Sequence, residues 1–160
     1  MSVFDLIDES DQLISHEYKF YPWPRAWAAY DLQDSFKWEV FPFQRDQTEN
    51  VPRQPGIYSF VIQPGIISYP DCSYLMYIGK AERTLRQRFS EYLHEQNNLA
   101  GRPQILRLLN KYQGYLYFCC AIITKRERIE EIEKALLKAI IPPCNVDLPA
   151  EIRRVRGAFQ

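Results

Sequence analysis

The chain has 160 residues, 46% of them hydrophobic and 25% charged, and its formal net charge at pH 7 is zero. That length suits one core of ordinary size and is too short for two comfortable domains. No apolar run is long enough for a membrane helix, so no membrane partner is expected, and the zero net charge argues against a generic nucleic-acid coat.

The charge is distributed unevenly along the chain. Residues 1–55 carry five basic and ten acidic side chains, whereas residues 56–160 carry fifteen basic and ten acidic side chains. A polyanion would therefore be attracted only to the second part. The first residues are acidic where a secretory signal is basic, and the four cysteines have neither zinc-site spacing nor disulfide density. A cytoplasmic protein with reduced thiols is expected.

Residues 1–54 predict an N-terminal extension that packs on the later core. A poorly periodic segment at 4–14 is compatible with a short helix, and a short strand is placed at 37–40. The extension has too many aromatic residues for a disordered segment. An aromatic platform for stacking bases is the alternative, but the acidity of this part opposes phosphate.

Two apolar runs, 56–62 and 74–79, are bounded by Pro and Gly residues and predict the strands of an antiparallel hairpin. After them, Thr84-Leu85-Arg86-Gln87 has the form of a capping box, which places a helix start at Thr84. The later elements follow from apolar runs and from Pro and Gly boundaries. They are a helix over 103–114, a central strand over 115–123 and a helix over 125–141. The core domain is expected at 55–148, with a tail at 149–160.

Glu133 is the most informative residue outside the hairpin. At about 100° per residue, it projects inside an apolar arc of the last helix. The arc consists of Ile129, Ile132, Leu136, Leu137, Ala139 and Ile140. Burying a carboxylate unpaired costs several kcal/mol, so we expect a partner such as an arginine, a run of amide donors or a metal ion. In an arbitrary protein, a structural ion pair is the usual explanation.

The tripeptides Gly56-Ile57-Tyr58 and Tyr77-Ile78-Gly79 resemble the GIY-YIG nuclease family, which is named for them. The resemblance covers residues 56–145, and its motif variant is similar to the nuclease module of the bacterial excision-repair incision subunit. The long loop between the tripeptides resembles that of GIY-YIG restriction enzymes, and Glu82-Arg83 adds one residue before the helix.

The resemblance implies an α+β fold with a three-stranded antiparallel sheet packed with helices. It also implies a Mg²⁺-dependent endonuclease that hydrolyses DNA phosphodiester bonds, with Tyr58 as general base and Arg88 on the scissile phosphate. One Mg²⁺ or Mn²⁺ ion would bind at Glu133. The residues with implied catalytic roles are Tyr58, Tyr77, Lys80, Arg88, Tyr92 and Asn145.

The expected partner is duplex or branched DNA, and no particular oligomeric state is predicted. The basic side chains expected to contact nucleic acid are Arg83, Arg86, Arg102, Arg107 and Lys111. Arg86 is also a rival to Arg88, because it lies nearer the apolar side of its helix. Two alternatives stay open. One is a nucleic-acid-binding module with little or no catalytic activity, and the other is a protein-interaction module that uses the tryptophan-rich N-terminus.

Overall fold

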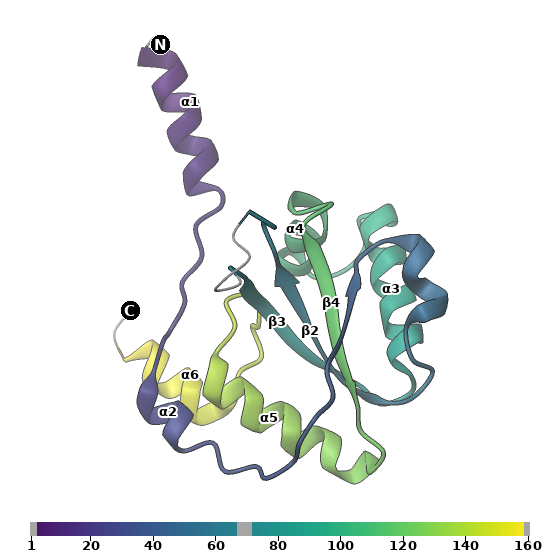
Figure 1. The fold of residues 1–160 in the computed structure, drawn as a ribbon. Helices are drawn as coiled ribbons and strands as arrows, with labels where there is room; N and C mark the ends of the chain where they lie inside the picture. The colour runs from purple at the N-terminus through teal and green to yellow at the C-terminus, as the bar shows by residue number, and fades with distance from the viewer. Residues whose placement is uncertain (1–2, 67–71, 159–160) are drawn as a thin grey trace.

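The protein is an α+β fold built on a four-stranded antiparallel sheet with helices on both faces (Figure 1). The structure, a computed structural model, describes residues 3–66 and 72–158. In chain order its elements are α1 (Val3–Ile14), α2 (Pro24–Ala28), β1 (Glu39–Pro42), the 3₁₀ turn η1 (Arg45–Asn50), β2 (Gly56–Ile62), β3 (Tyr74–Ala81), α3 (Leu85–Asn98), α4 (Pro103–Lys111), β4 (Leu116–Ile122), the 3₁₀ turn η2 (Arg126–Arg128), α5 (Ile129–Ile140) and α6 (Ala150–Gly157).

The strands lie in the order β1-β4-β2-β3. The hairpin of β2 and β3 is antiparallel as predicted, with Tyr58 opposite Gly79. β4 lies between β1 and β2, which confirms that its apolar run forms a central strand. Both faces of β2 are buried along its whole length, as the continuous apolar sequence of this strand requires.

The prediction of three strands was wrong, because β1 from the N-terminal extension pairs with the outer edge of β4. The pairing begins with Glu39 opposite Cys120 and ends with Pro42 opposite Tyr117. The strand therefore lies at 39–42 rather than at 37–40. Without β1, the central apolar strand would expose a row of unpaired backbone groups along one edge.

Two apolar cores lie on opposite faces of the sheet. Tyr58 and Phe60 point to the face covered by α3 and α4, whereas Ile57 points to the face covered by α5 and α6. The extension contributes to both cores, with Phe43 and Val51 buried in the first. Its partly buried residues in the second core are Tyr21, Trp23, Leu32 and Phe36. The extension therefore contributes to the cores with residues between 18 and 51, whereas α1 projects away from the sheet.

The helices begin and end where local chemistry allows. The Thr84 hydroxyl accepts a 3.0 Å hydrogen bond from the backbone N–H of Gln87, which confirms the predicted start of α3. α4 ends at Lys111, before the predicted boundary. α5 starts at Ile129, later than the predicted start at 125, because residues 126–128 form a 3₁₀ turn in which Arg128 donates to Asp34 at 2.9 Å. Among the described residues, no helix has the length and apolar character needed to cross a membrane.

Gly56→Ala should destabilise the fold by about 2 kcal/mol or more, since inserting atoms into packed structure strains the backbone. A Cβ at this position would clash with the backbone carbonyl of Ala121 on β4, which cannot rotate away. Thermal unfolding measures the effect. Gly157→Ala is the matched control, because a Cβ there meets no neighbouring atom. Equal melting temperatures for the two variants would contradict this account of the close β2–β4 approach.

Candidate active site

Tyr58 and Gly79 form the centre of the candidate site. They are opposite each other in the β2–β3 ladder, and a Cβ at Gly79 would lie 2.6 Å from the ring carbon Cζ of Tyr58. The phenol ring therefore lies across the bare backbone of Gly79. On its other side it stacks on Phe118, with ring centroids 5.0 Å apart. Only glycine at position 79 leaves room for this arrangement.

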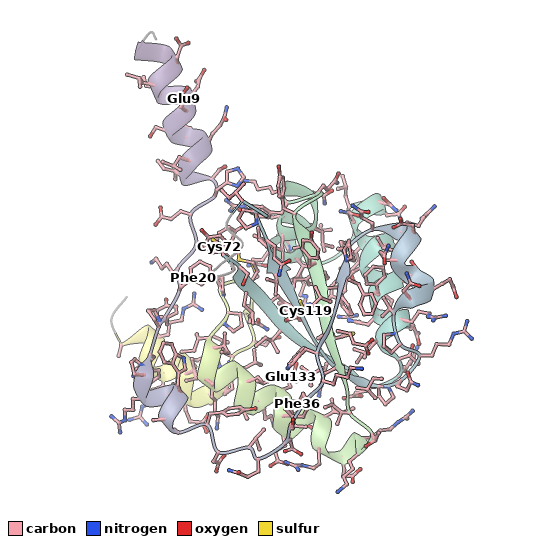
Figure 2. The ribbon with its side chains drawn as sticks, viewed as in Figure 1. Glu9, Phe20, Phe36, Cys72, Cys119 and Glu133 are labelled. Atoms are coloured by element: carbon pink, nitrogen blue, oxygen red, sulfur yellow. The ribbon has the colours of Figure 1, made fainter. Side chains whose placement is uncertain are left out.

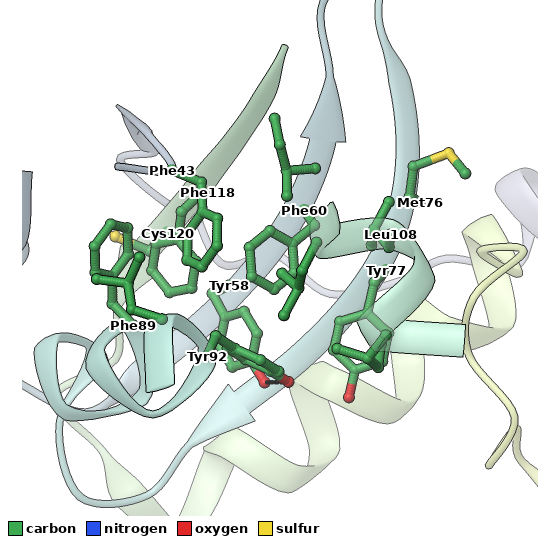
Figure 3. Close-up of a cluster of buried hydrophobic side chains, with 14 of the residues drawn as sticks. Phe43, Tyr58, Phe60, Met76, Tyr77, Phe89, Tyr92, Leu108, Phe118 and Cys120 are labelled. Atoms are coloured by element: carbon green, nitrogen blue, oxygen red, sulfur yellow. Dashed lines mark hydrogen bonds between the residues drawn. The ribbon is translucent and has the colours of Figure 1, made fainter. Parts of the chain in front are cut away.

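Helix α3 brings Arg88 and Tyr92, which are one turn apart, against Tyr58 (Figure 3 shows the tyrosines). Arg88 donates from Nε to the Tyr58 hydroxyl and from Nη2 to the Tyr92 hydroxyl, both at 3.2 Å. The two hydroxyls are 2.8 Å apart. Tyr58 and Tyr92 are 1% and 0% exposed, so the contact is made in a dry environment. Tyr58, Arg88 and Tyr92 therefore form one hydrogen-bonded trio.

Hydrogen counting shows what this trio can still bind. Both hydroxyls accept a hydrogen bond from Arg88, and one of them must donate to the other. One hydroxyl hydrogen is then left for an acceptor outside the trio. A guanidinium and a phenol hydroxyl are both donors, and such a pair favours an anionic oxygen as the acceptor.

Tyr77 joins this cluster from β3. Its ring lies 6.2 Å from that of Tyr58, and its hydroxyl points to the same side (Figure 3). Arg102 donates to the Tyr77 hydroxyl at 3.1 Å and lies over the ring with its guanidinium carbon 5.4 Å from the centroid. Three tyrosine hydroxyls and two arginines are thus gathered at one end of the β2–β3 hairpin.

Glu133 and Lys80 meet on the α5 side of β3. The Lys80 ammonium lies 3.1 Å from Glu82 and 3.9 Å from Glu133. Glu133 is half-buried among the apolar residues of α5, as its helical position predicted, and Figure 2 labels it beside the sheet. Burial raises the pKa of its carboxyl, Lys80 lowers it, and Glu130 and Glu82 raise it further, so that the net direction is upward. This carboxylate is poorly neutralised and is suited to an additional cation.

A cavity of about 240 Å³ lies between Lys80 and Arg88. Lys80 lines it from β3 and Arg88 lines it from α3, and each of them contacts a group behind the cavity wall: Glu133 lies 3.9 Å from Lys80, and the Tyr58 hydroxyl accepts from Arg88. Arg83 lines the same cavity and makes no ion pair with any residue that the structure describes. Glu91 also lines the cavity, and its carboxylate lies 2.8 Å from the Arg88 guanidinium.

The carboxylate of Glu133 suits a divalent cation that binds through one protein carboxylate better than a metal that requires several protein ligands. Within residues 3–66 and 72–158, no group of three or more His, Cys, Asp or Glu side chains could hold a metal ion. Mg²⁺ needs no such group, because it binds through one or two carboxylates and completes its shell with water and substrate phosphate. Glu133, half-buried and 3.9 Å from its lysine, can supply such a carboxylate. The four cysteines are free thiols.

Asn145 holds the site in place from outside the cavity. Its side chain accepts from the Ile78 N–H at 2.9 Å and donates to the Ile78 carbonyl at 2.8 Å. The neighbouring Cys144 N–H donates to the Met76 carbonyl at 2.9 Å. These bonds cover the outer edge of β3 between Tyr77 and Gly79. Asn145 therefore positions the strand.

The five basic residues expected to contact nucleic acid divide into two groups. Arg83 lines the cavity and Arg102 contacts Tyr77. The other three contact the N-terminal extension. Arg86 binds Glu49 and the Val51 carbonyl, Arg107 lies over the ring of Tyr18, and Lys111 donates to Ser15. Arg86 therefore contacts the extension, whereas Arg88 on the same helix contacts Tyr58 and Tyr92.

The protonation state of Tyr58 constrains any chemistry at this site. Burial raises its pKa well above 10, neighbouring Tyr92 and Tyr77 raise it further, and Arg88 lowers it without reversing the shift. The cation in contact with the phenol is Arg88. Tyr58 is a neutral hydrogen-bonding group at neutral pH and becomes a base only if further positive charge reaches it.

Two residues of the cavity were missed by the sequence reasoning. Glu82 and Glu91 pair with Lys80 and Arg88 and so set the charge of the cavity. Glu91 could have been found, because it lies three positions after Arg88 on the same helix face.

Searches of protein-family models, curated proteins and solved structures give no significant match for this chain.

Asn145→Ala should destabilise the protein by about 2 kcal/mol, because it leaves the Ile78 N–H and carbonyl without partners at a buried edge. Thermal or urea unfolding measures this change. Asn50→Ala is the control, since the side chain of the exposed Asn50 bonds to Gln47 within the same 3₁₀ turn. A variant at 145 that is as stable as the wild type would show that water replaces the amide and that the brace is unimportant.

Glu133→Gln should raise the melting temperature at neutral pH. Because the folded-state pKa of Glu133 is raised, the protonated carboxyl stabilises the fold at acidic pH, and this stabilisation is lost as the pH rises through that pKa. Glutamine mimics the neutral form, so the difference from wild type should shrink as the pH falls toward about 4.

Differential scanning calorimetry across this pH range tests the prediction. The control is Glu131→Gln on the exposed face of the same helix. A Glu133→Gln variant that melts below wild type at neutral pH would mean that the Lys80 ion pair outweighs the cost of burial.

Proposed function

We propose that this chain is a Mg²⁺- or Mn²⁺-dependent endonuclease of GIY-YIG type that hydrolyses phosphodiester bonds in duplex or branched DNA. The observation that carries the proposal is the convergence of Arg88 and Lys80 on one cavity. Arg88 brings the hydroxyls of Tyr58 and Tyr92, and Lys80 brings the carboxylate of Glu133. Residues far apart in the sequence thereby combine a cationic donor cluster with an under-neutralised carboxylate.

Phosphodiester hydrolysis requires these two properties side by side. The phosphate gains negative charge on its oxygens in the transition state, and donors already fixed around it lower the barrier. Arg88 is held by two tyrosine hydroxyls and Glu91, so its orientation is set before substrate arrives. A divalent cation, when bound at Glu133, supplies Lewis-acid stabilisation of the phosphate and leaving oxygens.

The chain's own residues would handle orientation and proton transfer. Arg88 and the free hydroxyl hydrogen of the trio would bind the phosphate oxygens. Tyr58 would orient the attacking water. It would accept the proton of that water only as a phenolate, after added positive charge near the site has lowered its pKa and its own proton has passed to solvent. Lys80 would keep Glu133 ionised, and Tyr77, held by Arg102, would place the nucleotide next to the cleaved bond.

Binding without cleavage is the second candidate. It is favoured by the raised pKa of Tyr58, which opposes proton abstraction at neutral pH. It is also favoured by the pairing of Lys80 and Arg88 with Glu82 and Glu91, which a phosphate would have to displace. Both features are compatible with a site that binds a phosphate backbone and catalyses little.

Incubation with supercoiled plasmid and Mg²⁺, with EDTA as control, separates the two candidates. Wild type should nick or linearise the plasmid, and Glu133→Gln should lower the rate by about a hundredfold or more, as expected when several kcal/mol of transition-state stabilisation are lost. Glu131→Gln should cleave like wild type. DNA binding by Glu133→Gln, measured by fluorescence anisotropy, should stay near the wild-type level.

The outcomes distinguish the competing roles. Tight, salt-dependent DNA binding by wild type with no nicking at any Mg²⁺ or Mn²⁺ concentration would support the binding module. A Glu133→Gln variant that cleaves like wild type would refute the metal role of Glu133. Absence of DNA binding at low salt would refute both nucleic-acid candidates.

A further inference from the structure

Helix α1 exposes an apolar stripe to solvent. Leu6, Ile7, Leu13 and Ile14 are 53%, 51%, 76% and 60% exposed. At about 100° per residue they lie on one side of the helix, and Asp8 and Gln12 lie on the opposite side. Figure 1 shows the helix projecting away from the sheet and its covering helices. An isolated helix of 12 residues is marginal in water, so this stripe calls for a covering surface.

The chain directs α1 away from its own domain. Lys111 Nζ donates to the carbonyl and the hydroxyl of Ser15, both at 2.8 Å, and His16 shares a 3.0 Å hydrogen bond with Tyr112. The residues that follow α1 are therefore fixed to α4 and the loop after it. From this attachment the extended segment runs to α2 while the helix points outward (Figure 1).

A complementary surface lies elsewhere on the same chain, between this extended segment and α6. It is a groove of about 370 Å³, and all but one of its lining residues are apolar. Phe20 and Val155 on its walls are 45% and 46% exposed, and Figure 2 labels Phe20 on the extended segment. Tyr21 and Ile152 lie deeper in the groove. Arg156 closes one side, with its guanidinium over the ring of Tyr21.

The charges of α1 and α6 indicate which segment binds in the groove. The described part of α1 has four acidic residues and no basic one, whereas α6 has three arginines and one acidic residue, Glu151. The acidic residues of α1 are Asp5, Asp8, Glu9 and Asp11, and the arginines of α6 are Arg153, Arg154 and Arg156. Two acidic α1 helices would repel each other, so pairing of α1 with α1 is disfavoured. An acidic helix with an apolar stripe matches an apolar groove beside an arginine-rich helix.

We infer that α1 of one copy docks in the groove of a second copy, so that two chains form a dimer by exchanging their N-terminal helices. Each chain supplies its α1 and its groove, and reciprocal exchange uses both and closes the assembly with two-fold symmetry. The inference is independent of the catalytic proposal, because none of the cavity residues takes part in it.

Sedimentation velocity on the full chain over a range of concentrations tests the inference. Wild type should form a dimer, and Leu13→Asp should convert it to monomer by placing a charge on the stripe. Gln12→Asp is the matched control, since it adds the same charge at the next position on the opposite face, and it should stay dimeric. Val155→Asp should give a monomer from the groove side.

Mixing the variants adds a test that misfolding cannot imitate. Leu13→Asp keeps an intact groove and Val155→Asp keeps an intact helix, so an equimolar mixture should regain a dimer held by one exchanged helix. A Val155→Asp variant that dimerises like wild type would point to pairing of α1 with α1 and would overturn the inference. Wild type that is monomeric at every concentration would overturn it as well.

Discussion

The packing of the Tyr58 phenol across the bare backbone of Gly79 is the constraint on which the candidate site depends. A side chain at position 79 would occupy the place of the ring, and Phe118 holds the ring from its other side. Because the phenol is fixed, its hydroxyl meets Arg88 and Tyr92 from the helix that follows the hairpin. The glycine thus serves to shape the sheet around an aromatic ring rather than to give the chain a special backbone conformation.

The N-terminal extension is an integral part of this domain. It completes the sheet with β1 and buries Phe43 and Val51 in the core that contains Tyr58. It also pairs Glu49 with Arg86 and places Ser15 on Lys111. Acidic and polar groups of the first 55 residues therefore engage part of the positive charge that the rest of the chain carries. Lys80, Arg83 and Arg88 line the cavity, and Arg102 contacts Tyr77.

Short-range patterns predicted the parts of the structure that depend on neighbours in sequence. The hairpin, the capped start at Thr84 and the half-buried position of Glu133 all follow from spacings within one element. Long-range pairing could not be predicted in this way. β1 forms only because β4 has an open edge, and Asn145 finds Ile78 across 67 residues of chain. Separate strand and helix patterns likewise do not show that Lys80 and Arg88 line one cavity.

A crystal structure of the protein with Mn²⁺ and a DNA duplex would test most directly the claim that these residues form one phosphodiester-cleaving site. The account predicts anomalous density for one ion bonded to a Glu133 oxygen. It also predicts a backbone phosphate in contact with both that ion and the Arg88 guanidinium, inside the cavity shared with Lys80. Manganese bound elsewhere, or DNA lying along the arginines of α6 with the cavity free of phosphate, would contradict it.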